Sequence, residues 1–176
     1  MMRKLSMDEL NRHDADSFKN SEKIAVVAVL DNLRSLNNVG AFFRTADAFS
    51  LQKIVLCGFT GQPPHREIHR SALGAEDVVP WEHVDKIASA LQTLQTAGYH
   101  CVAIEQTSGS IPLHHFNFTK GQSYALVFGN EVEGVSDEAL ACCQYAIEIP
   151  QAGTKHSLNV SVCGGIVLWE CFKQLG

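Results

Sequence analysis

The chain has 176 residues, of which 45% are hydrophobic and 19% are charged, and its net charge at pH 7 is −5. These totals predict a globular domain that buries enough apolar surface to be stable without disulfides or a metal. They argue against a membrane protein, because no run approaches the roughly 20 apolar residues that a spanning helix needs. The negative charge argues against a nucleic-acid partner, unless basic residues gather locally.

The cysteines and the N-terminus indicate a cytoplasmic protein with one main domain. None of the six cysteines forms a C-x-x-C pair, and most lie in apolar runs, which is typical of buried free thiols. We expect no signal peptide, because the first residues lack an apolar segment. Residues 1–22 are expected to form an arm or a short helix, and residues 23–176 a single domain.

Short apolar runs alternate with helical patterns along the chain. Strands are predicted at residues 24–32, 53–59, 77–81, 99–106, 123–130 and 145–150. Helices are predicted at residues 39–49 and 85–98, from residue 136 onward, and at residues 158–175. The pattern predicts an α/β fold with a mainly parallel sheet flanked by helices. Ligands are then expected at the loops that follow the strands.

The first of these helices lies in the stretch SLNNVGAFFRTADAF, residues 35–49, where Asn37 or Asn38 is placed to cap it. Arg44 points away from the apolar stripe of this helix and has small residues one turn away. The resulting groove beside a guanidinium fits an anionic substrate. An ion pair of Arg44 with Asp47 on a solvated face fits the same spacing equally well.

Two further loops carry polar residues in apolar surroundings. After the strand at residues 123–130, Gly129 would let a ligand approach the backbone, and Glu131 would stand at the strand's C-terminal end. Solvated glutamates in a polar loop are the alternative. Before the last helix, Ser157 is placed as a cap, whereas Asn159 lies among apolar residues and suggests another role.

The most basic segment of this acidic chain is PPHREIHRSALGAED. Arg66, His69 and Arg70 fall on one face of it if the segment is helical, so they form a candidate surface for an anionic partner. A solvated basic face is the alternative. His65 and His69 have the spacing of a metal pair, but no third ligand suggests itself, and we expect no metal site.

These stretches resemble the motifs of the SpoU/TrmH-type RNA 2'-O-ribose methyltransferases of the SPOUT superfamily. NNVGAFFRTADAF is similar to the first motif, LVFGNEVEGVS to the second and IPQAGTKHSLNVSV to the third, in family order. The likeness runs from about Leu30 to Trp169. It implies a deep C-terminal trefoil knot, a homodimer, and S-adenosylmethionine as cofactor, without a metal.

The resemblance also implies roles for individual residues. The implied catalytic residues are Arg44, Asn38, Glu131, Ser157 and Asn159. The implied cofactor-binding residues are Gln106, Thr107, Gly129, Ile149 and Leu158, and RNA would contact Arg66, His69 and Arg70. In the family, the arginine serves a site near the partner subunit's cofactor. Because a guanidinium keeps its proton, Arg44 is better suited to holding a phosphate and stabilising an alkoxide than to acting as a base.

The expected function is therefore S-adenosylmethionine-dependent 2'-O-methylation of a ribose in RNA. We favour tRNA, because many rRNA-directed relatives carry an additional RNA-binding domain before this one. The alternatives are an rRNA 2'-O-methyltransferase and a catalytically inactive RNA-binding dimer of the same fold. An unrelated α/β cofactor protein is disfavoured, since the chain lacks the G-x-G-x-x-G fingerprint of dinucleotide-binding proteins.

Overall fold

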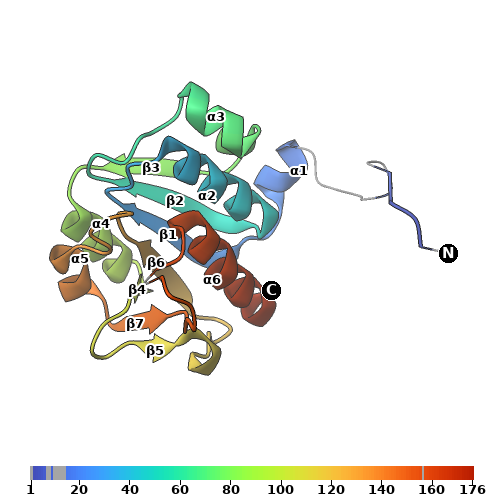
Figure 1. Cartoon of the computed structure of the whole chain (residues 1–176). Helices are drawn as coiled ribbons and strands as arrows, with labels where there is room; N and C mark the ends of the chain where they lie inside the picture. Colours follow the sequence, from blue (N-terminus) through green and yellow to red (C-terminus); the bar gives the residue numbers. More distant parts are fainter. Residues whose placement is uncertain (1, 7–8, 10–14, 156) are drawn as a thin grey trace.

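Seven strands of the described chain form one sheet, with helices on both of its faces (Figure 1). The computed structural model describes residues 2–6, 9, 15–155 and 157–176. The strands are β1 Ile24–Asp31, β2 Leu51–Cys57, β3 Trp81–Val84, β4 Tyr99–Ile104, β5 Ile111–Pro112, β6 Ser123–Phe128 and β7 Tyr145–Glu148. The helices are α1 Ala15–Asn20, α2 Leu36–Ala48, α3 Arg66–Ala72, α4 Ile87–Thr96, α5 Asp137–Cys142 and α6 Val160–Leu175, with 3-10 turns η2 Ala75–Asp77 and η3 Leu113–His115.

The strand order is β3-β2-β1-β6-β4-β7-β5, and every neighbouring pair is parallel. This arrangement confirms the predicted α/β class with a mainly parallel sheet flanked by helices. In a parallel sheet the carboxyl ends of all strands lie at one edge. The loops that follow β1, β2, β4, β6 and β7 therefore gather at that edge.

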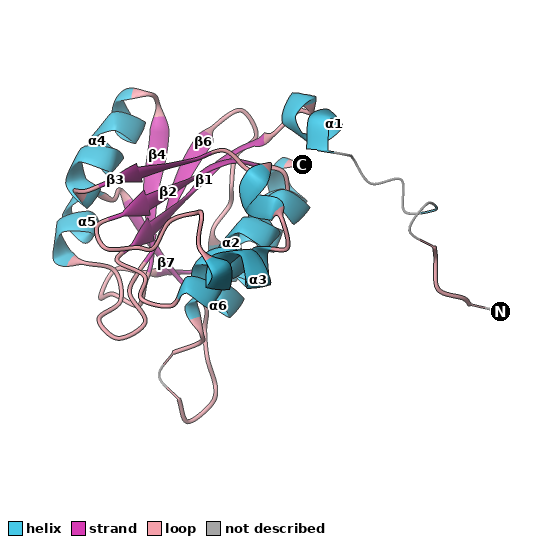
Figure 2. Cartoon of the chain, turned by 90° about the horizontal axis from the view of Figure 1, so that it is seen from above, coloured by secondary structure: helices cyan, strands magenta, loops and turns pink. Residues whose placement is uncertain are grey.

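The sheet separates two hydrophobic cores. Figure 2 shows the helices that cover its two faces. On one face α2, α3 and α6 bury side chains such as Phe42, Ile68 and Leu168. On the other face α4 and α5 bury Leu91 and Ala139. Both faces of the central strands are covered, which explains why their sequences are continuously apolar. Within the described residues, no helix is long and apolar enough to cross a membrane.

The C-terminal part of the chain passes from one face of the sheet to the other at β7. β7 lies between β4 and β5, and the chain that runs from β4 through β5 returns to β6 beside β4. The chain enters β7 from α5 on one face and leaves it for α6 on the other face. A deep trefoil knot requires a crossing of this kind, and the knot itself stays a prediction.

Two strand assignments differ from the sequence prediction. The strand predicted at residues 77–81 is wrong, because η2 occupies its start and β3 begins only at Trp81. Pro80 has no N–H group for a ladder, although its carbonyl accepts a hydrogen bond from Ile54 N–H at 2.9 Å. β5 was not predicted, since two residues are too few to produce a periodic pattern.

Two helix starts also differ from the prediction. Ser35 caps α2 by accepting a hydrogen bond from Asn38 N–H, so the capping role predicted for Asn37 or Asn38 is wrong. Asn159 caps α6 by accepting hydrogen bonds from the backbone N–H groups of Ser161 and Val162, so the capping role suggested for Ser157 is wrong as well. The first correction leaves the side chain of Asn38 free for contacts at the site.

Candidate functional site

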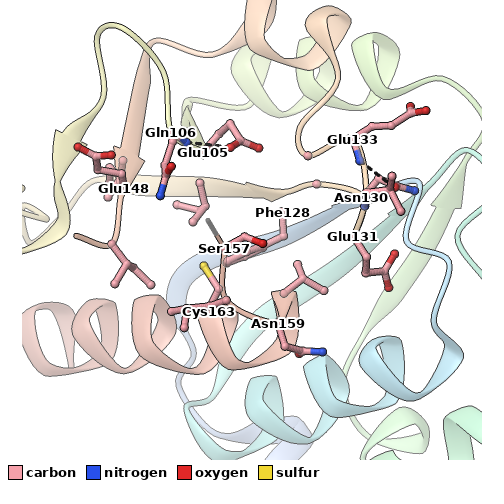
Figure 3. A pocket seen from close by; sticks show the side chains of 18 of the residues that line it. Glu105, Gln106, Phe128, Asn130, Glu131, Glu133, Glu148, Ser157, Asn159 and Cys163 are labelled. Carbon is pink, nitrogen blue, oxygen red and sulfur yellow. Dashed lines mark hydrogen bonds between the residues drawn. The ribbon is translucent and has the colours of Figure 1, made fainter. Parts of the chain in front are cut away.

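A cavity of about 570 Å³ opens at the carboxyl edge of the sheet (Figure 3). The loops after β4, β6 and β7 and the start of α6 form its walls. Among the predicted site residues, those that line it are Gln106, Gly129, Glu131, Ile149, Ser157, Leu158 and Asn159. The structure thus brings together segments that are up to 53 residues apart in the chain, counted from Gln106 to Asn159.

The cavity combines an acidic rim with an apolar floor. Its acidic side chains are Glu105, Glu131, Glu133 and Glu148. Among the described lining residues there is no lysine or arginine. Apolar lining is provided by side chains such as Phe128, Ile147 and Leu158. This composition favours a ligand that carries positive charge and also offers a flat or apolar part.

Glu131 holds the entrance of α2 to the cavity loop. Its carboxylate accepts hydrogen bonds from the backbone N–H groups of Arg34 at 2.9 Å and Ser35 at 3.0 Å, and from Asn38 Nδ2 at 2.9 Å. Partial burial raises the pKa of Glu131, but these hydrogen bonds outweigh it and hold the pKa below the ordinary value of 4.5. The carboxylate is therefore ionised at neutral pH.

Asn38 carries the network onward to α6. Its Oδ1 accepts hydrogen bonds from Asn159 Nδ2 and Ser161 Oγ, both at 3.3 Å. The side chain of Asn159 in turn accepts a hydrogen bond from Ser161 N–H at 2.9 Å. Three polar residues of the three sequence motifs, Asn38, Glu131 and Asn159, are thus joined in one hydrogen-bonded chain. The network fixes the ends of α2 and α6 relative to the cavity.

Replacing Glu131 by glutamine is expected to lower the stability of the protein at pH 7 by about 1 kcal/mol. The two carboxylate oxygens accept hydrogen bonds from three donors, whereas a neutral amide has one acceptor oxygen and places an NH₂ group against the remaining donors. The pKa of Glu131 is lowered in the folded protein, so its contribution is fully present above pH 4.5 and is lost as the pH falls below that value.

Thermal unfolding of both proteins at pH 7 and at a pH below 4.5 checks this prediction. The wild-type protein should lose more of its melting temperature on acidification than Glu131→Gln does. Equal melting temperatures at pH 7 would show that the hydrogen bonds of Glu131 contribute nothing to the fold.

The loop after β6 is folded back tightly against itself. Asn130 and Gly134 exchange backbone hydrogen bonds of 2.8 and 2.9 Å. A Cβ atom at Gly129 would lie 2.0 Å from the carbonyl carbon of Gly134 and 2.1 Å from the nitrogen of Val135. Glycine is therefore required at position 129 by the protein's own backbone, which comes close here without any ligand.

Two of the residues that shape the cavity were missed by the sequence analysis. Glu105 accepts hydrogen bonds from Gln106 N–H at 2.8 Å and Val135 N–H at 2.9 Å, and so ties the loops after β4 and β6 together. Asn130 Nδ2 donates to the carbonyl of Asn32 at 2.6 Å, and so ties the loops after β6 and β1. Their position directly after buried strands is the signal that could have identified them.

Arg44 lies outside the cavity of its own chain. Its side chain is exposed on α2 and makes no hydrogen bond or ion pair with any other described residue, including Asp47. The alternative of a local pair with Asp47 is therefore not realised. Arg44 follows Asn38 by six positions, which is about 9 Å along a helix axis. Its guanidinium is free to meet a group that the chain itself does not supply.

The remaining predicted residues lie away from the cavity wall. Thr107 lines a separate hollow of about 320 Å³ beside β5. Arg66, His69 and Arg70 are exposed on α3, which packs against α2. His69 is already engaged, since its Nδ1 lies 2.5 Å from Oε1 of the buried Glu76. Of these three residues of α3, only Arg66 and Arg70 form no ion pair with a described residue.

Comparison with known proteins identifies relatives that match most of the chain. The model of the SpoU rRNA Methylase family matches residues 25–169. The 23S rRNA (guanosine-2'-O-)-methyltransferase RlmB of Vibrio parahaemolyticus is 32% identical over 166 residues, which cover 94% of this chain and 66% of that protein. The chain thus spans slightly less than two thirds of the length of that relative.

Solved structures show the same arrangement of strands and helices. The AdoMet-bound rRNA methyltransferase from Sinorhizobium meliloti superimposes with a TM-score of 0.81 at 28% identity, over 90% of this chain and 60% of that one. The TrmH/SpoU tRNA modifying enzyme from A. aeolicus superimposes with a TM-score of 0.80 at 27% identity, over 91% of this chain and 81% of that one.

Proposed function

Because this chain belongs to the SpoU rRNA methylase family, we propose that it transfers a methyl group from S-adenosylmethionine to a ribose 2'-hydroxyl of RNA. The observation that carries the proposal is the cavity at the carboxyl edge of the sheet. Its walls come from the second and third motifs, and a hydrogen-bonded chain from Glu131 through Asn38 to Asn159 joins it to the first.

The cavity suits S-adenosylmethionine by its size, its apolar lining and its charge. Its volume of about 570 Å³ lies within the range of small-molecule sites. The backbone at Gly129, Ile149 and Leu158 and the side chain of Gln106 would hold the cofactor, and apolar side chains would cover its adenine. When bound, this cofactor supplies a methyl group on a positively charged sulfonium. Four glutamates around the cavity favour that positive charge.

Arg44 is the residue best suited to act on the ribose. Making the 2'-hydroxyl nucleophilic requires stabilisation of negative charge on its oxygen, and a guanidinium provides that charge without giving up its own proton. The same group also pairs well with the adjacent RNA phosphate. We assign Asn38, Glu131 and Asn159 to positioning, because they fix α2, the helix that carries Arg44, relative to α6 and the loop after β6.

The distance of Arg44 from its own cavity is explained if two copies of the chain combine their residues. α6 exposes an apolar stripe of Val162, Ile166 and Trp169, which are 53%, 40% and 51% exposed and lie on one face of the helix. Beside them a Cβ atom at Gly165 would meet no described atom within 4 Å. An exposed apolar patch next to a glycine favours a close contact with a second subunit. The homodimer proposed here lets Arg44 serve the partner's cavity.

Replacing Ile166 by aspartate is expected to convert the dimer into a monomer at micromolar protein concentration. A buried unpaired carboxylate in an interface costs several kcal/mol, which corresponds to at least about a hundredfold weaker association. Sedimentation velocity measures the mass. Leu73→Asp, which adds the same charge at another exposed apolar residue, should leave the mass unchanged. A dimeric Ile166→Asp would place the subunit contact elsewhere.

The class of RNA remains a separate part of the proposal. The RlmB relative is named for 23S rRNA and the S. meliloti structure for rRNA, whereas the A. aeolicus structure is named for tRNA. The curated relatives therefore favour rRNA over the tRNA that the sequence suggested. Both classes offer a ribose 2'-hydroxyl, so the cavity chemistry is the same for either.

Methyl transfer from radiolabelled S-adenosylmethionine to purified tRNA and to purified rRNA tests the function. The proposal predicts label in one of the two RNA pools. The labelled group should be on a ribose, and the phosphodiester that follows this ribose should resist alkaline cleavage. Label on a base, or on protein, would contradict the proposal. Binding of RNA without any transfer would favour the inactive RNA-binding dimer instead.

A further inference from the structure

Phe59 is exposed to an unusual degree for an aromatic side chain beside a cavity. It belongs to the loop between β2 and α3, at the same edge of the sheet as the cavity, and its exposure is 65%. A phenylalanine left in water forgoes the stabilisation that burial of its ring would provide. The loop nevertheless presents the ring outward.

The backbone beneath Phe59 is held in place from several sides. Phe59 N–H donates to Asn32 Oδ1 at 3.1 Å, and Gly58 N–H donates to the carbonyl of Val84 at 3.1 Å. A ring nitrogen of His83 lies 2.8 Å from the carbonyl oxygen of Gly58. Gly58 has a φ of +61°, and a Cβ atom there would meet Asn32 Oδ1 at 2.1 Å. The loop is therefore built around a conformation that only glycine fits.

The residue that follows Phe59 is anchored inside the protein. Thr60 is 2% exposed, and its hydroxyl donates to the carbonyl of Leu30 at 3.1 Å. The same hydroxyl oxygen accepts a hydrogen bond from Leu33 N–H at 3.0 Å. With both neighbours of the ring fixed, Phe59 is a rigid projection and not the tip of a mobile loop.

The projection stands next to the rim of the cavity. Asn32, which binds Phe59 N–H through its side chain, also accepts the hydrogen bond from Asn130 through its backbone carbonyl. Asn130 lines the cavity. Two residues after Asn32, Arg34 is exposed while its N–H donates to Glu131 at 2.9 Å. An exposed ring and an exposed cation thus flank the place where the loops after β1 and β6 meet.

We propose that Phe59 stacks on an unpaired base of the RNA, next to the ribose that is methylated, while Arg34 faces the RNA backbone. This inference rests on the proposed function. A ribose reaches a cavity at a sheet edge only if its nucleotide leaves a duplex stack, and an exposed aromatic ring replaces the lost stacking. Phenylalanine on a rigid loop is suited to this role because every base has a flat face.

Binding of a short single-stranded oligouridine and of an oligoadenine–oligouridine duplex to the full chain tests the proposal. Phe59→Ala should bind the single strand about tenfold more weakly, in line with the usual contribution of one base–aromatic stack. Phe59→Tyr keeps a ring and should bind like the wild-type protein. Phe59→Leu keeps apolar bulk without a ring and should bind as weakly as Phe59→Ala. Duplex binding should be the same in all four proteins.

Three results would overturn the proposal. Wild-type affinity in Phe59→Leu would show that apolar bulk suffices and that no stacking occurs. An equal loss on single strand and duplex would show that the substitution damages the protein. A change in the sedimenting mass of Phe59→Ala would show that the ring contacts a second subunit. Because these readouts are binding and mass, they stand whether or not the wild-type protein transfers methyl groups, and the transfer assay tests the proposed function by itself.

Discussion

Replacing Arg44 by alanine is expected to lower methyl transfer to RNA by about a hundredfold to a thousandfold, which is the usual effect of removing one group that stabilises developing negative charge. The guanidinium of Arg44 makes no hydrogen bond or ion pair with the described part of its own chain, so its loss should not disturb the fold. It does not line the cavity of its own chain either. Steady-state transfer from labelled cofactor measures the rate, and calorimetric titration of the cofactor measures its affinity, which should not change.

Arg44→Lys is the matched control. Lysine keeps the charge but loses the planar pair of donors that fits a phosphate, so its rate should fall between those of the wild-type protein and Arg44→Ala. Cofactor affinity should be similar in all three proteins. Transfer by Arg44→Ala at nearly the wild-type rate would show that the guanidinium has no part in the chemistry.

Replacing Gly129 by alanine is expected to weaken cofactor binding at least about tenfold. The added Cβ atom would lie 2.0 Å from the carbonyl carbon of Gly134, and backbone on both sides leaves it no flexible side chain to displace. The loop from Asn130 to Gly134 must then open, and its paired backbone hydrogen bonds of 2.8 and 2.9 Å would be lost. Isothermal titration with S-adenosylmethionine measures the change in affinity.

Gly109→Ala provides the comparison for Gly129→Ala. Gly109 lies in an exposed loop outside the cavity wall, and a Cβ atom there would meet nothing within 4 Å. It should bind the cofactor like the wild-type protein. If Gly129→Ala also binds normally, the tight turn after β6 does not shape the site. Circular dichroism shows in either case whether the variants are folded.

The sequence predicted most of the architecture because the central strands are continuous apolar runs and the long helices show a helical apolar period. The apolar runs that became β1, β4, β6 and β7 end within two residues of their predicted limits. The prediction failed where the local pattern is weak or ambiguous. Residues 77–81 look like a strand, yet Pro80 and the 3-10 turn before it delay β3 to Trp81.

The sequence indicated the cavity residues better than their hydrogen bonds. Glu131 and Asn159 were predicted from their position after a strand and before a helix, and both line the cavity. Their link through Asn38 depends on contacts between residues 93 and 121 positions apart, which no local pattern encodes. Ser35 has the capping role that was expected of Asn37 or Asn38, and this leaves the amide of Asn38 free to form the link.

The position of Arg44 shows what one chain alone does not provide. The sequence predicted that the guanidinium of Arg44 points away from the apolar stripe of its helix. In the structure Arg44 is exposed and lies away from the cavity. On α2 the polar network involves Asn38, which lies six positions before Arg44, and it continues from there to α6 and not toward Arg44. In the proposed dimer, the cofactor cavity belongs to one subunit and the arginine to the other.

Methyl transfer by mixed dimers of Arg44→Ala and Gly129→Ala tests this arrangement most directly. A dimer of either variant alone has two defective sites. If Arg44 acts on the partner's cavity, a mixed dimer has one site with both defects and one site with none. Random mixing is then predicted to restore roughly one quarter of the wild-type rate of transfer to RNA, since about half of the dimers are mixed. No restoration in mixtures whose subunits are shown to exchange would contradict the account, because Arg44 would then serve its own subunit.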